Sequence, residues 1–141
     1  MHHQNTKSII GQSVHIQFPE LGIINVPSRI DTGARTSAVW ASRISENDGK
    51  LEFVLFDKQS SLYTGELLTF EQFETREVTS SNGIKEERYM VKLLVKMDGR
   101  SIRARFTLAN RSTQKYPVLI GRNVLRGKFV VDIKHSKPLP N

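Results

Sequence analysis

A short acid-containing motif is the part of this 141-residue sequence that could do chemistry. An apolar, strand-like stretch ending at Ile30 delivers Asp31, and Thr32, Gly33 and Ala34 follow. A carboxylate at the end of a strand can be held rigidly and partly shielded from water. Gly33 lets the backbone turn, and its amide can approach the carboxylate because no Cβ stands in the way. Thr32 offers a hydroxyl to fix the loop, and the small Ala34 permits close packing. The motif indicates carboxylate catalysis.

The same motif is also compatible with a simple turn, because Asp before a glycine-containing loop commonly bonds to its own backbone. The chain holds one Asp-Thr-Gly; Asp48-Gly49 and Asp98-Gly99 lack the hydroxyl residue and are typical of hairpin turns. Peptide hydrolysis by aspartates needs two adjacent carboxylates that share one proton. The catalytic hypothesis therefore requires a homodimer in which Asp31 meets its symmetry mate.

A second motif lies about ninety residues downstream of Asp31. Residues 118–120 are apolar, and Gly121, Arg122 and Asn123 lead into two more apolar residues. This pattern predicts a buried strand, a glycine and a short helix. By itself it is equally compatible with a strand and helix unrelated to Asp31.

The elements that must position these motifs are mostly strands. Alternation, β-branched residues and turn signals predict strands near 14–18, 22–26, 29–30, 51–56, 73–79, 87–97, 101–108, 117–120 and 129–133. Helices are predicted at 122–126 and, from a weaker pattern, at 67–73. Many short strands at close spacing favour a sandwich or barrel.

Length and composition limit the alternatives. The sequence fits a single domain over 1–141, with an ordered core of about 9–136. It has no cysteine, which excludes disulfides and thiolate chemistry. It also lacks a signal-peptide pattern and a membrane-length apolar run, so we expect a cytoplasmic protein with no membrane partner. The net charge of +7 suits acidic partners or a simple basic surface.

The two motifs together resemble retropepsins, which carry Asp-Thr-Gly-Ala early and an apolar pair with Gly-Arg-Asn near the end. The run from Asp31 to Ala38 more closely resembles a bacterial family known as ATP-dependent zinc proteases, found beside or fused to ATP-grasp ligases that add glutamate. Further stretches are similar to that family: 18–22, 80–83, 88–89, 106–112 and 116–132. The resemblance covers roughly residues 9–136.

This resemblance implies an all-β, retropepsin-like acid-protease barrel with one short C-terminal helix. It implies an aspartic endopeptidase-like hydrolase that acts on a peptide or protein substrate and is linked to an ATP-grasp ligase system. The implied catalytic residues are Asp31, Thr32 and Gly33. The implied supporting residues are Ala34, Arg35, Thr36, Ser37, Gly121, Arg122 and Asn123. In such dimers the terminal segments usually join into shared strands, for which the N-terminal strand and the tail after Val131 are candidates.

Two positions depart from the family pattern. Trp40 stands where relatives commonly have His, and Arg35 stands where retropepsins usually have a second Asp. That Asp would pair with the helix arginine, so the resemblance implies an ion pair for Arg122 whose acid is missing. Asp132 is a candidate partner on charge alone.

The words ATP and zinc in the family's name find no support in the residues. There is no phosphate-binding Gly-rich loop and no His-Glu-x-x-His motif. The histidines are His2, His3, His15 and His135, and His15 lies on a predicted strand where a solvent-facing role is expected. We therefore predict no metal and no cofactor.

Two other classes of function stay open. The first is a non-catalytic module on a protease-like barrel that binds a peptide or acidic ligand, with Arg29, Arg35 and Arg43 around the Asp31 loop. The second is a basic barrel that binds single-stranded nucleic acid, which we do not expect because the few aromatic residues occupy strand positions that look buried. A protease also needs a flap; residues 57–65 are favoured over the hairpin around Asn82-Gly83.

Overall fold

Strands make up most of the computed structural model, which describes residues 6–79 and 82–134. The elements are β1 (Ser8–Ile10), β2 (Ser13–Phe18), η1 (Pro19–Leu21), β3 (Ile23–Ile30), β4 (Ser37–Asn47), β5 (Lys50–Leu55), β6 (Leu67–Phe70), β7 (Glu74–Thr79), β8 (Lys85–Met97), β9 (Arg100–Ala109), β10 (Val118–Ile120), α1 (Arg122–Leu125) and β11 (Phe129–Val131). Across these described residues, no helix combines the length and apolar character needed to cross a bilayer.

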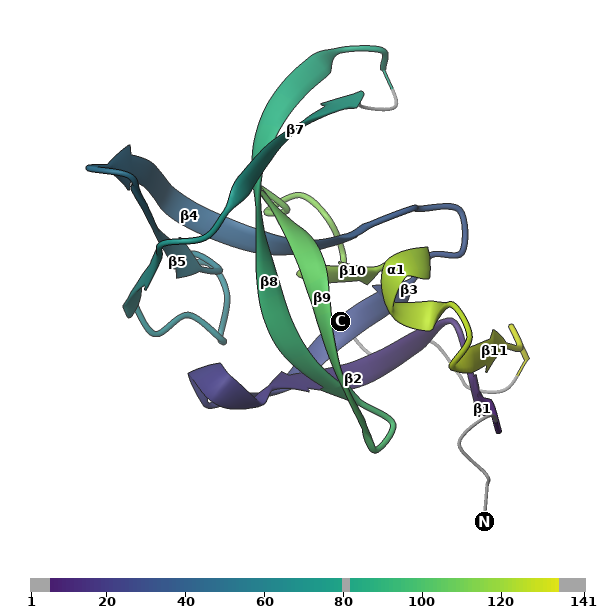
Figure 1. Ribbon diagram of the computed structural model, residues 1–141. Coiled ribbons are helices and arrows are strands. Elements are labelled where there is room, and N and C mark those ends of the chain that lie inside the picture. The colour runs from purple at the N-terminus through teal and green to yellow at the C-terminus, as the bar shows by residue number, and fades with distance from the viewer. Residues whose placement is uncertain (1–5, 80–81, 135–141) are drawn as a thin grey trace.

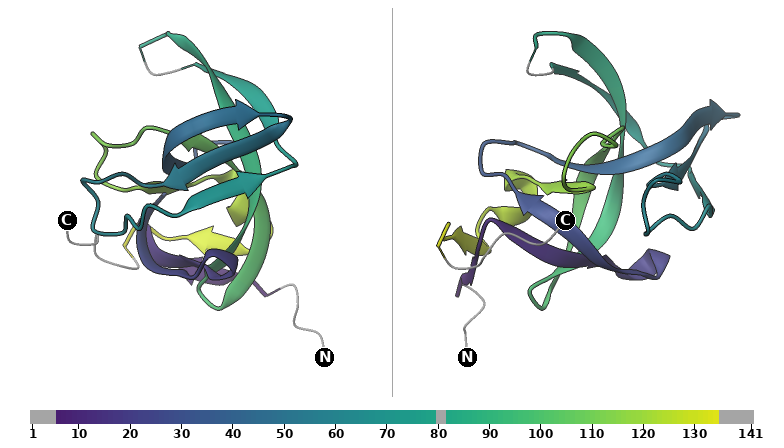
Figure 2. Two further views of the ribbon diagram at one scale, coloured as in Figure 1. Left: turned by 90° about the vertical axis from the view of Figure 1, so that its left-hand side faces the viewer. Right: turned by 180° about the vertical axis from the view of Figure 1, so that it is seen from behind.

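The main sheet closes on itself (Figure 1). Strands β10, β3, β2, β8, β9 and β4 pair in that order, and β10 also pairs with β4. Closure removes the free edges that an open sheet would expose. Strands β5 and β6 continue from β4, and β7 pairs with β8 to form a hairpin that rises beyond the ring (Figure 2). The prediction of an all-β barrel with one short C-terminal helix is confirmed.

Alternating residues of the long strands fill the inside of the ring. Along β9, Ile102, Ala104 and Phe106 are buried, whereas Arg103 and Arg105 face outward. Period-two alternation of this kind is what one buried sheet face requires. The Phe106 ring meets Phe18 of β2 edge to face, with the ring centroids 5.7 Å apart. The core thus joins strands that are far apart in sequence.

Two local predictions need correction. Residues 67–73 are not helical, because 67–70 form β6 and pair antiparallel with β5. A short apolar run is ambiguous between helix and strand, and here a partner strand decides. The alternation search also misses β4, because its first half, residues 37–41, is buried on both faces and shows no alternation.

Strand β10 lies between β3 and β4. It runs parallel to β3, with Ile120 opposite Ile30, and antiparallel to β4, with Val118 opposite Val39. The loop 31–36 joins β3 to β4, so it must cross the end of β10. At that crossing the Asp31 amide donates to the Ile120 carbonyl at 2.9 Å. The fold therefore brings the two sequence motifs together.

Gly121 allows the β10 end to touch the 31–36 loop. A Cβ at this position would lie 2.4 Å from the Thr36 carbonyl oxygen and 2.8 Å from that of Ala34. The next amide, that of Arg122, donates to the Ala34 carbonyl at 2.8 Å. A side chain would have to push these backbones apart, and glycine is the residue without one.

The two terminal strands pair with each other inside one chain. Strand β1 runs parallel to β11, with Ser8 opposite Phe129 and Ile9 opposite Val130. The expectation that the terminal segments form strands shared between subunits stays a prediction, because its C-terminal candidate is the tail after Val131, where β11 ends. The last residues, 135–141, lie outside the described part of the chain.

Two surface ion pairs tie connecting segments to β9. Arg103 donates to both carboxylate oxygens of Glu20 in η1, at 3.0 and 2.8 Å. Arg105 donates to Glu74, at the start of β7, at 2.6 Å. In each pair the hydrogen bond to the arginine lowers the pKa of the glutamate below its usual 4.5. Both pairs are exposed, so each contributes modestly.

We predict that Gly121→Ala destabilises the protein by about 1–3 kcal/mol, the usual range for overpacking in a tight site. Denaturant unfolding measures the effect. Gly33→Ala is the comparison, because its added Cβ would come no closer than 3.3 Å to a neighbouring atom. Equal stability of Gly121→Ala and the unchanged protein would contradict the close contact.

We predict that the Glu20 and Glu74 pairs make stability depend on acid pH. Since their pKa values are lowered on folding, the stabilisation is present above the unfolded value near 4.5 and is lost as pH falls through the lower folded pKa. On acidification, the melting temperature of the double variant Glu20→Gln/Glu74→Gln should fall by less than that of the unchanged protein. Glu66→Gln serves as the control, because Glu66 forms no ion pair among the described residues. Identical pH profiles would contradict the prediction.

Candidate active site

The Asp31 carboxylate is fixed by its own loop. Asp31 is half-buried directly after β3, and its Oδ1 accepts a hydrogen bond from the Gly33 amide at 2.9 Å. The Ala34 amide donates to the Asp31 carbonyl at 3.3 Å, which closes the turn. Among residues 6–79 and 82–134, no hydrogen bond reaches the other oxygen, Oδ2. One carboxylate oxygen is therefore oriented and the other is free to act on a ligand or a second acid.

The close approach of the Gly33 amide is as expected, whereas the expected hydrogen bond of the Thr32 hydroxyl is not seen within the described chain. An added Cβ on Gly33 would lie 3.3 Å from Asp31 Oδ1, so the absent side chain does permit the close amide. Thr32 is exposed, and within the described chain its hydroxyl makes no hydrogen bond. Within the described chain the loop is held by its backbone groups and by the side chains of Asp31 and Arg122, and the expectation that the Thr32 hydroxyl fixes the loop stays a prediction.

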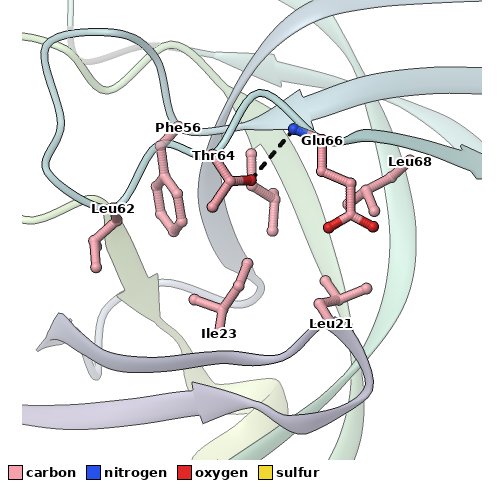
Figure 3. Close-up of a pocket in the computed structure, with 8 residues that line it drawn as sticks. Leu21, Ile23, Phe56, Leu62, Thr64, Glu66 and Leu68 are labelled. Carbon is pink, nitrogen blue, oxygen red and sulfur yellow. Dashed lines mark hydrogen bonds between the residues drawn. The ribbon is translucent and has the colours of Figure 1, made fainter.

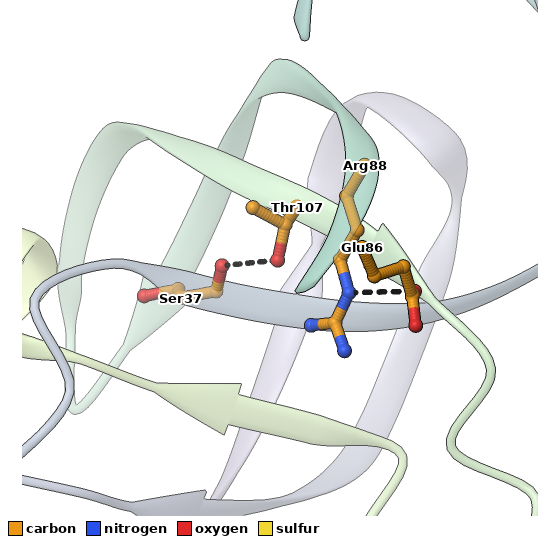
Figure 4. Close-up of polar contacts among 4 residues, drawn as sticks. All are labelled: Ser37, Glu86, Arg88 and Thr107. Atoms are coloured by element: carbon orange, nitrogen blue, oxygen red, sulfur yellow. Dashed lines mark hydrogen bonds and ion pairs between the residues drawn. The ribbon is translucent and has the colours of Figure 1, made fainter. Parts of the chain in front are cut away.

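Ser37 connects the loop to the second motif. Its buried Oγ donates to Asn123 Oδ1 at 2.8 Å and accepts from the Gly121 amide at 2.9 Å. The Asn123 side chain also donates to the Arg105 carbonyl of β9 at 2.8 Å. Behind Ser37, the Thr107 hydroxyl donates to the Ser37 carbonyl at 3.3 Å (Figure 4). A hydroxyl and an amide thus join β4, α1 and β9 around the loop.

Arg122 supports the loop in another way than the resemblance implies. Its Nη1 donates to the carbonyls of Thr32 and Gly33, at 3.2 and 3.1 Å. It forms no ion pair with any described residue, and Asp132 instead accepts from the Lys134 amide at 2.9 Å. The prediction of an ion pair for Arg122 is therefore wrong. Arg35 stands where an acid was expected, and the Arg122 guanidinium donates to backbone carbonyls instead.

The remaining predicted residues lie at the loop's outer end. Arg35 is exposed and Thr36 is half-buried. The Arg35 carbonyl accepts from the Asn123 amide at 3.1 Å. The fold thus gathers all ten predicted site residues around one loop and one helix: Asp31, Thr32, Gly33, Ala34, Arg35, Thr36, Ser37, Gly121, Arg122 and Asn123.

Arg111 interacts electrostatically with Asp31 and with two further arginines. Burial lowers the pKa of Arg111, and the positive charges of Arg88 and Arg29 lower it further, while the Asp31 carboxylate acts in the opposite direction. Arg111 donates through Nε to the Tyr116 carbonyl at 3.0 Å, and Arg88 donates to Glu86 at 3.0 Å (Figure 4). The sequence placed Arg29 near the Asp31 loop. Arg88 and Arg111 lie in stretches that resemble the family, but they are more than fifty residues from Asp31 and nothing local predicts that they are close to it.

The loop favoured as the flap lies in the wrong place. Residues 57–65 pack through Leu62 beside Leu21 and Ile23 (Figure 3). Ile23 begins β3 whereas Asp31 follows its end, roughly 26 Å away for eight strand residues. By contrast, the β7–β8 hairpin, which carries Arg88, arches toward the side of the 31–36 loop in Figures 1 and 2. The preference for 57–65 is therefore wrong.

Metal ligands are not gathered in the described part of the chain. His15 is exposed on β2, in agreement with a solvent-facing role, and no three His, Asp or Glu side chains there are grouped to hold an ion. His2, His3 and His135 lie outside the described residues.

Comparison with solved structures supports the fold. A Legionella pneumophila protein of unknown function (DUF785) superposes with a TM-score of 0.63 at 24% identity, covering 90% of this chain and 94% of that one. At this identity the likeness concerns architecture alone.

Comparison with sequences identifies relatives and a family. Proteins named "Probable alpha-L-glutamate ligase" from Shewanella pealeana and Shewanella halifaxensis are each 32% identical over 136 residues, covering 94% of this chain and 30% of the relative. One of the same name from Desulfotalea psychrophila is 29% identical over 131 residues, covering 89% of this chain and 28% of that protein. This chain therefore spans under a third of the curated relatives it matches.

A family model described as retropepsin-like aspartic endopeptidase RimB matches residues 9–137. It covers both motifs, the Asp31 loop and the Gly121 segment. The chain belongs to the RimB-like family of retropepsin-like aspartic endopeptidases.

Proposed function

We propose that this protein is a homodimeric aspartic endopeptidase in which Asp31 of each subunit activates water for peptide-bond cleavage. The observation that carries the proposal is the Asp31 carboxylate itself, with Oδ1 held by the Gly33 amide at 2.9 Å and Oδ2 left without a hydrogen bond among the described residues. A structural turn needs only the first of these contacts. A catalytic dyad needs both the held oxygen and the free one.

The chemistry requires a second subunit. Two carboxylates within hydrogen-bond reach hold one proton between them, because like charges so close cannot both ionise. The ionised acid takes a proton from water as the water oxygen attacks the peptide carbonyl. The other acid gives its proton to the carbonyl oxygen, which forms a diol. The first acid then passes the proton taken from water to the departing amine as the C–N bond breaks, and a diol hydroxyl returns a proton to the second acid as the carboxyl product forms. Each chain supplies one Asp-Thr-Gly, so the second acid comes from the partner's copy of Asp31.

The surface proposed to meet the partner adjoins Thr32. A hollow of about 340 Å³ is lined by Thr32 of the loop, three apolar side chains and two arginines, namely Leu125, Phe129, Val131, Arg122 and Arg126. On the adjoining β1–β11 ribbon, Ile9 and Val130 lie opposite each other and are 53% and 47% exposed. Exposed apolar side chains beside an incomplete site favour burial against a second copy.

The positive charge of Arg111, which interacts with Asp31, and of the arginines that act on Arg111 favours an acidic peptide as substrate. Arg29 and Arg111 form no ion pair within the described chain, and Arg88 has only an exposed neighbour, Glu86. Guanidinium groups pair strongly with carboxylates. Since curated relatives carry the name glutamate ligase, we propose glutamate-containing peptides made by an ATP-grasp ligase system as the substrate class.

The flap in this proposal is the β7–β8 hairpin. Its pairing joins Glu74–Thr79 to residues 85–90, and it stands beyond the ring, so it can bend without opening the core. Closure would carry Arg88 onto a bound peptide and shield the reaction from water. A non-catalytic binding module for acidic peptides remains the second candidate, because the same arginines would serve it.

Asp31→Asn should abolish cleavage of a glutamate-rich peptide while leaving the fold intact. The neutral amide cannot accept a proton from water, and general acid–base catalysis is typically worth about 10²–10⁴-fold. Peptide cleavage followed by mass spectrometry measures the loss, and circular dichroism checks the fold. Sedimentation of the unchanged protein at micromolar concentration should give a dimer.

Two results would count against this scheme. Full cleavage by Asp31→Asn removes the enzyme assignment to this residue. Full activity in a strict monomer removes the shared site. Tight binding of the peptide with no cleavage by either protein would favour the binding module.

Arg29→Gln and Arg88→Gln should each raise KM for the glutamate-rich peptide about tenfold, the worth of one charge-assisted contact. These positions are chosen because Arg111 also holds the Tyr116 carbonyl. A glutamine-containing peptide of the same length should respond little. Lys58→Gln, at an exposed position of the 57–65 loop away from Asp31, is the control for lost charge, because Arg76 lies directly opposite Arg88 in the hairpin. If all three variants and both peptides change alike, the charge argument is wrong.

A further inference from the structure

A second basic hollow lies on the α1 side of the 31–36 loop. Its volume is about 520 Å³, and its lining is Arg35, Arg122, Asn123 and Arg126. Three of these four side chains are arginines, and none is acidic. Within the described residues, none of the three arginines forms an ion pair.

Backbone hydrogen bonds hold the three arginines together. The Asn123 amide donates to the Arg35 carbonyl at 3.1 Å, and the Arg126 amide donates to the Arg122 carbonyl at 2.9 Å. Arg122 itself is anchored by the carbonyls of Thr32 and Gly33. The chain positions from which the three positive charges project are therefore fixed, and an anion entering the hollow finds them already gathered.

Asn123 forms a wall of the hollow and does not recognise a ligand. Its Oδ1 accepts from Ser37 and its Nδ2 donates to the Arg105 carbonyl, both at 2.8 Å. With the amide committed on both sides, the groups left to recognise a ligand are guanidinium groups. Guanidinium pairs bidentately with the oxygens of phosphate and carboxylate groups.

We propose that this hollow is a binding site for a compact polyanion with about three negative charges, of the pyrophosphate or tricarboxylate kind. The volume lies within the usual range of about 300–1,000 Å³ for small-molecule sites. The site shares no residue with the Arg29, Arg88 and Arg111 group, but it shares Arg122 and Arg126 with the hollow that is proposed to meet the partner. Arg35 lines only the present hollow, so its variant tests the polyanion site apart from dimerisation.

Arg122 connects this site to the Asp31 loop. The guanidinium that lines the hollow also donates to the Thr32 and Gly33 carbonyls, and the Gly33 amide holds Asp31 Oδ1. A polyanion that orders the Arg122 side chain therefore strengthens its hydrogen bonds to the loop carbonyls. Gly33, whose carbonyl accepts one of these bonds, also donates its amide to the Asp31 carboxylate. Occupancy should be felt at Thr32 and Gly33 although the ligand contacts neither carboxylate oxygen.

The test is a titration of the full chain with sodium pyrophosphate at constant ionic strength set by sodium chloride, followed by calorimetry and amide NMR. Citrate is the carboxylate arm, and acetate is the monovalent comparison. Saturable binding of pyrophosphate or citrate, much stronger than that of acetate, is expected. Arg35→Gln and Arg126→Gln should each weaken it about tenfold, and the Thr32 and Gly33 amide signals should move. Arg76→Gln should leave binding unchanged.

Several results overturn the proposal. If Arg76→Gln weakens polyanion binding as much as the Arg35 and Arg126 variants do, the attraction is nonspecific. If Arg29→Gln abolishes binding and those two variants do not, the anion binds on the Asp31 side of the loop. Saturable binding that leaves the Thr32 and Gly33 signals unmoved rejects the connection through Arg122. Melting curves of the Arg35 and Arg126 variants, which alter exposed side chains, ensure that lost binding is not lost folding. Asp31→Asn should still bind the polyanion, so failure of the peptidase proposal and failure of this one are distinguishable.

Discussion

The contact between the end of β10 and the 31–36 loop is the constraint on which the rest of the site depends. Strand β10 lies between β3 and β4, so the loop that joins those two strands has to cross it. Gly121 lets the backbones meet, since a Cβ there would lie 2.4 Å from the Thr36 oxygen. The Asp31 amide then reaches the Ile120 carbonyl. A carboxylate that would otherwise sit on a mobile turn is held at the edge of a closed ring.

Polar groups around this contact are satisfied from three directions. The Ser37 hydroxyl joins β4 to α1, Asn123 joins α1 to β9, and Arg122 returns to the loop carbonyls. Buried polar groups that are fully paired specify one arrangement strongly, because any other leaves one of them unsatisfied. The helix of four residues is thus better understood as a clamp for the loop than as an independent element.

Positive charge is distributed unevenly around the clamp. Arg29 and Arg88 act on Arg111, which interacts with Asp31, whereas Arg35, Arg122 and Arg126 line the hollow on the α1 side. Arg35 adds a positive charge to the second group, at a position where the resemblance to retropepsins implied an acid for Arg122. Arg122 donates instead to the loop carbonyls, so it both supports the loop and adds charge to the surface beside it.

The sequence by itself determined the strand-rich barrel, the short helix and both motifs, because alternation, turn residues and a characteristic acid-hydroxyl-glycine order are local signals. It could not determine β4, whose doubly buried half shows no alternation, nor β6, where pairing with β5 overrides a helix-like run. The tertiary structure alone decided which arginines lie near Asp31, what Arg122 binds and which hairpin stands over the site. Those outcomes depend on strands distant in sequence becoming neighbours when the sheet closes, and no local pattern records that geometry.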